Sequence, residues 1–135
     1  MAFHGYKEVE HTADIALRVW GEDFPTLLQQ AADGLYALMG IKPVGDATTV
    51  QFFTIPQGTP ETILVDFLGE LLYQAEADDL VLGGFNFIVG QDAVSVWSIG
   101  RKILSQEMVF KAVTFHNLTV EDTESGMIAT ITFDV

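Results

Sequence analysis

Hydrophobic residues alternate with polar ones in several short stretches of the chain, a spacing typical of β-strands with one buried face. Ile15, Leu17 and Val19 point to one side of such a strand, and Asp14 falls on the opposite side. From residue 80 onward the pattern is almost entirely of this kind. The strands that these patterns predict are 6–10, 15–20, 50–55, 80–89, 93–99, 109–120 and 127–135.

Two other stretches repeat their apolar residues every three or four positions, as on one face of an α-helix. The first helix begins near Pro25 and ends at Gly40. The second has Thr59 as its N-cap, Pro60 at its first position and Glu61 beside the positive end of the helix dipole. The apolar positions are Leu28, Ala31, Leu35 and Leu38 in the first helix and Leu64, Phe67, Leu68, Leu71, Leu72 and Ala75 in the second.

The order of these elements predicts the fold class. Two strands, a helix, a strand and a second helix precede a run of strands, so helices and strands do not alternate regularly. This order disfavours a doubly wound parallel sheet. We expect an α+β fold, with two helices packed on a mostly antiparallel or mixed β-sheet in a two-layer arrangement. Since no segment resembles a linker, residues 1–135 are expected to form a single domain.

The amino-acid composition excludes several classes of protein and of functional site. The chain has 135 residues, 49% of them hydrophobic, so it can bury a core. It has no cysteine, which excludes a disulfide framework, a thiolate zinc site and a cysteine nucleophile. We see neither a signal peptide nor an apolar run of the roughly 18 residues that a membrane span requires. A cytoplasmic protein without a membrane partner is therefore expected.

The charge is strongly negative. The chain has nineteen Asp and Glu residues and only six Lys and Arg residues, so its formal net charge is −13. Binding to nucleic acid depends on basic side chains that release counterions, so direct nucleic-acid binding is not expected. A negative surface suits cation binding or docking on a basic protein. Solubility alone would also explain most of these charges.

The segment EHTAD, residues 10–14, contains four polar or charged side chains directly before a predicted strand. At the other end of the chain, Asp134 lies on the polar side of the last strand. Hard cations such as Ca²⁺ and Mg²⁺ prefer carboxylate and carbonyl oxygens, and Asp14 and Asp134 could share one if their strands meet. On pattern alone, a solvated Asp at each strand end is the simpler interpretation.

Other polar residues leave similar alternatives open. Thr12 could bond a turn and His11 could be a satisfied, partly buried imidazole. The three histidines are far apart in sequence, which disfavours a zinc site. Lys111 is either simply exposed or a contact for an anion, and Asp66 and Glu70 are either a solvated helix face or an acidic pair. No phosphate-binding or nucleophile motif is present, so the sequence gives little support to a hydrolase.

Four segments taken together resemble the archease family. They are HTADIAL at 11–17, ILVDFLGELLY at 63–73, KAVTFHNLTV at 111–120 and the terminal ITFDV at 131–135. Each is weak alone, but they occur in the family's order and cover nearly the whole chain. The resemblance implies a small acidic α+β protein that acts on a GTP-dependent RNA-splicing ligase, which joins tRNA halves. Archease promotes guanylylation of that ligase and so permits multiple turnovers. The chain itself would then be a non-catalytic protein cofactor.

The resemblance also implies the site. In the family a divalent cation is held by the Asp of the HTAD motif, the penultimate Asp and the last residue. Here these are Asp14, Asp134 and Val135, the last through a main-chain oxygen. Ca²⁺ is the first expectation, with Mg²⁺ or Mn²⁺ as alternatives. Lys111, His11 and Glu70 are further functional candidates. Glu10 departs from the Asp that many relatives carry there.

Two rival functions remain open at this stage. One is a chaperone-like modulator of RNA-modifying enzymes such as methyltransferases, a role that has also been discussed for the family. The other is an independent metal-dependent hydrolase, which the missing nucleophile and base constellation disfavours. The sequence leaves the oligomeric state, the resident metal and the surface that contacts the ligase undetermined.

Overall fold

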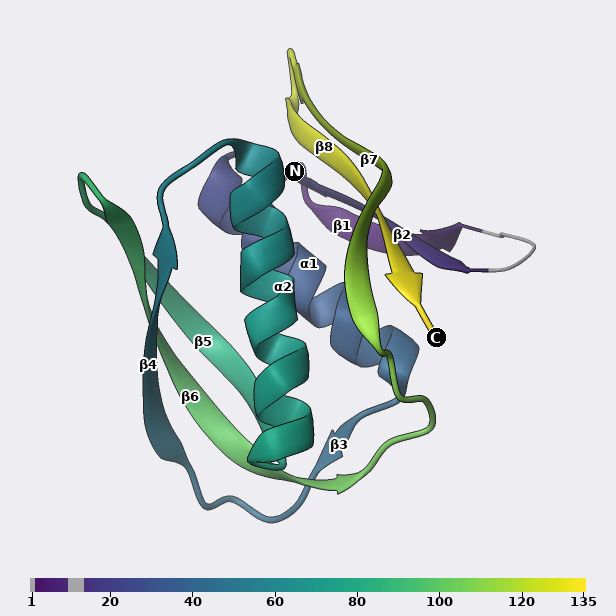
Figure 1. Cartoon of the computed structure of the whole chain (residues 1–135), viewed down its shortest axis with the longest axis vertical. Coiled ribbons are helices and arrows are strands. Elements are labelled where there is room, and N and C mark those ends of the chain that lie inside the picture. The colour runs from purple at the N-terminus through teal and green to yellow at the C-terminus, as the bar shows by residue number, and fades with distance from the viewer. Residues whose placement is uncertain (1, 10–13) are drawn as a thin grey trace.

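A computed structural model describes residues 2–9 and 14–135 of the chain (Figure 1). It contains two helices and eight strands in an α+β arrangement. The elements, in order, are β1 (Gly5–Val9), β2 (Ile15–Gly21), α1 (Phe24–Met39), β3 (Lys42–Pro43), β4 (Thr49–Pro56), α2 (Pro60–Ala77), β5 (Leu80–Val89), β6 (Ala93–Ser105), β7 (Ala112–Thr123) and β8 (Gly126–Asp134).

The strands form two antiparallel sheets. The first has the order β1-β2-β8-β7, so it joins the first strands of the chain to the last. In the second, β6 is central and pairs with β4, β5 and the short β3. The α+β class is therefore confirmed, but the strands are divided between two sheets where the sequence predicted one.

Local chemistry explains where the helices begin and end. Asp23 caps α1, because its Oδ1 accepts a hydrogen bond of 2.9 Å from the Thr26 N–H. Thr59 caps α2 in the same way, accepting from the Thr62 N–H at 3.2 Å, as the sequence predicted. Gly40 ends α1 in the left-handed conformation, where φ is 62° and a side chain would be strained.

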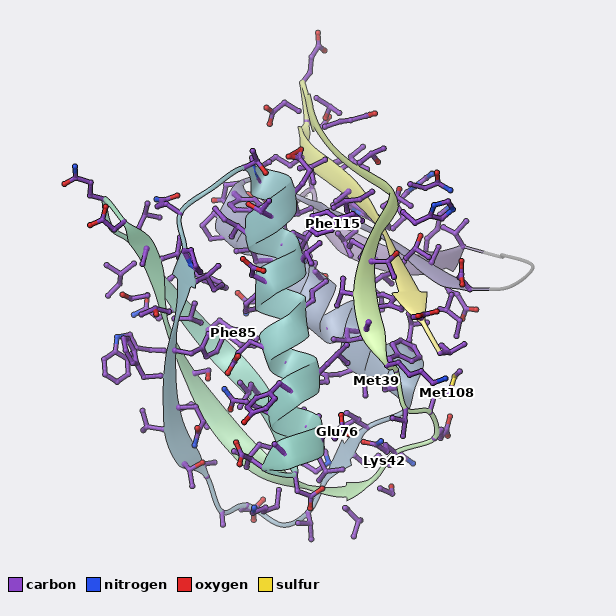
Figure 2. All side chains as sticks on the ribbon, viewed as in Figure 1. Met39, Lys42, Glu76, Phe85, Met108 and Phe115 are labelled. Atoms are coloured by element: carbon purple, nitrogen blue, oxygen red, sulfur yellow. The ribbon has the colours of Figure 1, made fainter. Side chains whose placement is uncertain are left out.

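The helices pack between the sheets and bury one continuous core. Figure 1 shows α1 and α2 next to each other, with the first sheet on one side and the second on the other. α1 packs mainly on β1 and β2, while α2 contacts β7 and also reaches β4 and β5. Phe67 of α2 stands at the centre of an aromatic cluster with Phe53, Phe85 and Phe87 of the second sheet. Figure 2 shows Phe85 between α2 and that sheet.

Backbone irregularities shape β5 and β7. β5 carries one extra residue between Gly83 and Asn86, and Gly84 there adopts a φ of 60°. β7 is interrupted between Thr114 and Thr119, where Asn117 also has a positive φ of 55°. Because of this interruption the side-chain alternation expected for 109–120 is broken, and Phe115 is exposed.

The remaining differences from the sequence prediction occur at element ends. β3 was not predicted, since two residues carry no periodicity. β6 continues to Ser105, six residues beyond the predicted strand, because β3 and β5 pair with its second half. β7 begins at Ala112 and not at residue 109, since the preceding chain bends toward α1. There the Glu107 and Met108 N–H groups both donate to the Met39 carbonyl, and Figure 2 shows Met39 and Met108 next to each other near the start of β7.

Neither described helix is long and apolar enough to cross a membrane.

Candidate functional site

Three strand ends converge at one edge of the first sheet. β2 and β8 are antiparallel neighbours, and their last registered pair at this edge is Ile15 with Phe133. Asp14 and Asp134 are the next residues outward on the two strands. Since side chains alternate, both Asp side chains belong to the face opposite Ile15 and Phe133, which is the face away from the core. Two residues 120 positions apart in sequence are thus neighbours in the sheet.

The start of β7 completes this edge. The Lys111 N–H donates a hydrogen bond of 2.8 Å to the Asp134 carbonyl, and Ala112 is registered opposite Asp134. Phe110, just before them, is 3% exposed and packs on Phe133 with 5.2 Å between ring centroids. This buried aromatic pair anchors both chains directly beneath the strand ends, so the edge has a defined geometry.

The carboxylates stand above a sheltered part of the sheet. The next pair inward on the same face is Ala16 with Thr132, and each of these residues is 2% exposed. Asp14 is half-buried, whereas Asp134 and Val135 are exposed. We refer to Asp14, Asp134 and Val135 as the terminal edge.

A cavity lies beside this edge, between α2 and the start of β7. Its volume is about 540 Å³, and Glu70, Tyr73 and Lys111 are among its lining residues. Glu70 is half-buried and its Oε1 accepts a hydrogen bond of 3.0 Å from the Gln74 side chain. The structure thus brings Glu70 and Lys111, which were separate candidates in the sequence, to one cavity. Asp66 lines the same cavity.

Other sequence candidates are not brought to the terminal edge. His116 lies in the interrupted part of β7, where its Nε2 is 3.2 Å from the Asn117 amide. His11 and Thr12 lie outside the described residues. Within 2–9 and 14–135, no three His, Cys, Asp or Glu side chains gather into a metal-binding group. Of the described residues, Asp14, Asp134 and Val135 are the ones that offer oxygen ligands at the terminal edge.

The donor chemistry of the terminal edge fits a hard cation. Asp14 and Asp134 would supply carboxylate oxygens from one face of adjacent strands, and Val135 would add main-chain oxygen. Oxygen-only sets of this kind suit Ca²⁺ and Mg²⁺ and do not suit metals that prefer sulfur or imidazole. Because Ca²⁺ takes six to eight oxygens, three protein residues would leave positions for water or for oxygen atoms of a partner.

Sequence reasoning missed two residues that shape this region. Phe110 is buried at the start of β7. In the sequence, the only indication of this was that an apolar residue directly precedes Lys111. Gln74 is 5% exposed on α2, and one of its side-chain contacts holds Glu70. A buried glutamine on a helix has no sequence signature that separates it from an exposed one.

Comparison with known proteins identifies relatives over the whole length. The sequence profile of the Archease protein family matches residues 6–135. The archease of Methanosarcina mazei is 30% identical over 141 residues, covering 96% of this chain and 95% of the relative. The archease of Saccharolobus solfataricus is 28% identical over 134 residues, covering 93% of this chain and 95% of the relative.

Solved structures share the fold. A crystal structure from Thermotoga maritima, described as an archease and possible chaperone, has a TM-score of 0.72 at 25% identity and covers 96% of both chains. The solution structure of protein 1598 from Methanobacterium thermoautotrophicum also has a TM-score of 0.72, at 19% identity, and covers 97% of this chain and 99% of that one. From the match of the family profile to nearly every residue, this chain belongs to the archease family.

Proposed function

We propose that this protein is a non-catalytic activator of the GTP-dependent RNA-splicing ligase, and that it acts through a divalent cation held at the terminal edge. The observation that carries the proposal is the convergence of Asp14 and Asp134 on adjacent strands, on one face of the first sheet. Family membership supports the class of function, and the position of the carboxylates supports the site.

Each residue of the proposed site has a distinct task. Asp14 and Asp134 hold the cation through carboxylate oxygens, and Val135 contributes main-chain oxygen. Lys111 fixes the position of Asp134 through its backbone N–H and presents its side chain beside Glu70 in the adjoining cavity. When bound, the cation would supply a Lewis-acidic centre with coordination positions left for oxygen ligands of the partner.

The charge of the protein agrees with a protein partner. A net charge of −13 disfavours contact with RNA. It favours approach to a basic surface, and an enzyme that binds RNA carries such a surface. The protein would therefore bind the ligase, and the ligase alone would bind the RNA.

Counting ligations per ligase molecule tests the proposal. The protein is mixed with the ligase of its own organism, GTP and Mn²⁺, with RNA in excess. Many turnovers are expected with the protein and about one without it. Asp14→Ala and Asp134→Ala should each retain the fold and lose activation. If both variants activate normally, the site is wrong, and if the intact protein has no effect on turnover, the ligase function is wrong.

A chaperone-like modulator of RNA-modifying enzymes such as methyltransferases is the second candidate. The description of the Thermotoga maritima relative as a possible chaperone favours it. In this case the protein would suppress aggregation of a methyltransferase during heating and leave ligase turnover unchanged. Asp14→Ala and Asp134→Ala should then have little effect, because the terminal edge would have no part in binding the client.

A further inference from the structure

The outer face of the second sheet, away from the helices, carries a row of exposed apolar side chains. We call it the apolar face and define it by five residues on three strands. Their exposed fractions are far above those of core residues: Val50 66%, Phe52 49%, Ile88 53%, Trp97 44% and Ile99 40%.

Strand register makes this face continuous. Val50 pairs with Ile99 and Phe52 with Trp97 across β4 and β6, and the Phe52 and Trp97 rings are 4.5 Å apart. On the other side of β6, Ile88 of β5 is registered with Ser95, which lies next to Trp97 on the same face. The apolar face therefore extends over all three long strands of the second sheet.

The corresponding face of the first sheet has a different character. There Lys7 is paired with Arg18, and Arg18 donates to the Thr130 hydroxyl at 3.4 Å. The apolar residues of that face, Ala16, Trp20 and Ile128, are buried or half-buried, whereas Lys7 and Arg18 are exposed. The exposed apolar side chains of the second sheet therefore differ from the first sheet and require a separate explanation.

Charge on the apolar face is the most informative feature. The chain has nineteen acidic residues. None of them is among the side chains that alternate onto this face from β4, β5 and β6, and the only charged residue is Arg101. These side chains include Val50, Phe52, Thr54, Pro56, Val81, Asn86, Ile88, Ala93, Ser95, Trp97, Ile99 and Arg101.

The absence of Asp and Glu side chains from the apolar face indicates what kind of surface covers it. A basic partner would be attracted by carboxylates, and an acidic chain had many to place there. Single-stranded nucleic acid also stacks on exposed aromatics, but it needs several cations beside them, and the face has one. Carboxylates are unfavourable where the covering surface is apolar and belongs to a negatively charged body. A second copy of this chain has both properties.

We propose that the apolar face is a self-association surface through which two copies of the chain form a symmetric dimer. Its five apolar side chains expose roughly 500 Å², within the range of the largest patches on soluble proteins. A stable interface buries roughly 800 Å² per partner, so the polar residues around this patch would be covered as well. The same patch would be used on both copies, as in a twofold interface.

The ends of β6 suit a twofold arrangement. Asp92 directly precedes β6 and Arg101 lies near its far end, with Trp97 about midway. A twofold axis near Trp97 that lies in the interface and runs perpendicular to β6 would place Asp92 of one copy at the same rim as Arg101 of the other. The rim charges would thus be of opposite sign, while the apolar side chains met at the centre.

The net charge predicts how salt affects this dimer. Two copies at −13 each repel at long range, and added salt screens that repulsion. Self-association should therefore strengthen between about 20 mM and about 300 mM NaCl, by at least about tenfold in dissociation constant. A complex with a basic partner would respond in the opposite direction, since salt would weaken its attraction.

Sedimentation equilibrium of the intact protein tests the proposal. The average mass should rise from the monomer value of 14.8 kDa toward twice that value as concentration increases, more steeply at the higher salt. Trp97→Glu and Ile88→Glu, on two different strands, should each keep the monomer mass at every concentration. The controls Phe115→Glu and Leu104→Glu change apolar residues outside the face that are somewhat more exposed than Trp97 and Ile88, and they should still dimerise.

A second measurement needs no variant. In the wild-type protein, the indole N–H signal of Trp97 should shift with protein concentration in NMR spectra. The signal of Trp20, the other tryptophan, should not. The proposal is overturned if the wild-type protein stays monomeric at both salt concentrations, if salt weakens the dimer, or if the face variants dimerise as the controls do. It does not depend on ligase activation, because mass and indole shifts are measured without the ligase.

Discussion

At the scale of single residues, the central finding is the placement of Asp14 and Asp134. By sequence each is a polar residue at a strand end, for which a solvated carboxylate is the simpler interpretation. The register of β2 with β8 places them on one face of one edge, and the Lys111 backbone fixes the second of them. A cation that binds both carboxylates in the folded protein, and not in the unfolded chain, would stabilise the fold.

Calcium should raise the melting temperature of the protein. A ligand at about 100 times its dissociation constant adds roughly 2.7 kcal/mol to the free energy of unfolding. For a domain of this size that corresponds to a shift of several degrees, and EDTA should reverse it. Asp14→Asn and Asp134→Asn should each remove the shift. Asp46→Asn, in the exposed connection between β3 and β4, is the matched control and should keep it.

The N-cap of α1 gives a prediction with a defined pH dependence. Hydrogen bonds from Thr26 lower the pKa of the Asp23 carboxyl from its ordinary value of 3.8. The stabilisation is therefore present above that value and is lost as the pH falls through the lower folded-state pKa. Asp23→Ala should reduce the free energy of unfolding by about 1 kcal/mol at neutral pH.

Urea unfolding at neutral pH and near pH 3 measures this effect. The difference between wild type and Asp23→Ala should shrink at the acidic pH. Asp23→Ser, which keeps a capping oxygen without a titrating group, should stay close to wild type at neutral pH. An unchanged difference at both pH values would contradict a role for the ionised carboxylate.

At the scale of elements, one buried hydrogen bond links the second sheet to α1. The buried Leu82 N–H, on β5, donates a bond of 3.0 Å to the Tyr36 hydroxyl of α1. β5 lies at the edge of its sheet, so this N–H points away from β6 and has no strand neighbour to accept it. Burial raises the pKa of the Tyr36 hydroxyl well above its ordinary value of 10, so the group stays neutral in the folded protein.

Tyr36→Phe should therefore destabilise the protein by about 1–3 kcal/mol, because it leaves a buried N–H without an acceptor. Hydrogen exchange at the Leu82 amide should also accelerate. Tyr73→Phe removes a hydroxyl from a residue that is 62% exposed and should change stability by less than about 0.5 kcal/mol. Equal effects of the two substitutions would show that the bond from Leu82 contributes nothing.

Alkaline pH should affect the same bond. A folded-state pKa raised above the unfolded value means that the stabilisation is complete below pH 10 and is lost as the pH rises beyond it. Wild type should lose this part of its stability above pH 10, whereas Tyr36→Phe, which has no group to ionise there, should not. Thermal melts at matched alkaline pH values compare the two proteins.

At the scale of the whole molecule, net charge opposes compactness. With six basic residues against nineteen acidic ones, the folded chain repels itself more than the expanded chain does. The described cations do little to offset this. Two of them, Arg101 and Lys102, donate to the backbone carbonyls of Gly45 and Asp78.

Salt should therefore stabilise the monomer. Raising NaCl from about 20 mM to about 300 mM shortens the screening length to below 10 Å, and the melting temperature should rise by a few degrees. The melts are recorded at low protein concentration, where self-association through the apolar face does not contribute. Trp97→Glu should show the same rise, and a melting temperature that falls with salt would contradict the argument.

The hydrophobic pattern determined the class of most elements and the buried face of most of them, with β7 as an exception, because period and polarity act between neighbouring residues. Leu17 and Val19, predicted on the apolar side of their strand, are both fully buried. The N-cap of α2 at Thr59 and the end of α1 at Gly40 could also be predicted from the sequence, since each depends on a few adjacent backbone groups. The family resemblance indicated which acidic residues to follow among nineteen.

The tertiary structure alone decided which strands meet. The pairing of β2 with β8 joins residues more than a hundred positions apart, and no local preference encodes it. The same is true of the division into two sheets, which lets β6 run on to Ser105 and leaves the apolar face exposed on one side. The terminal edge and the apolar face are both sets of residues distant in sequence, and they become surfaces only when non-local strand pairing brings their members onto one face.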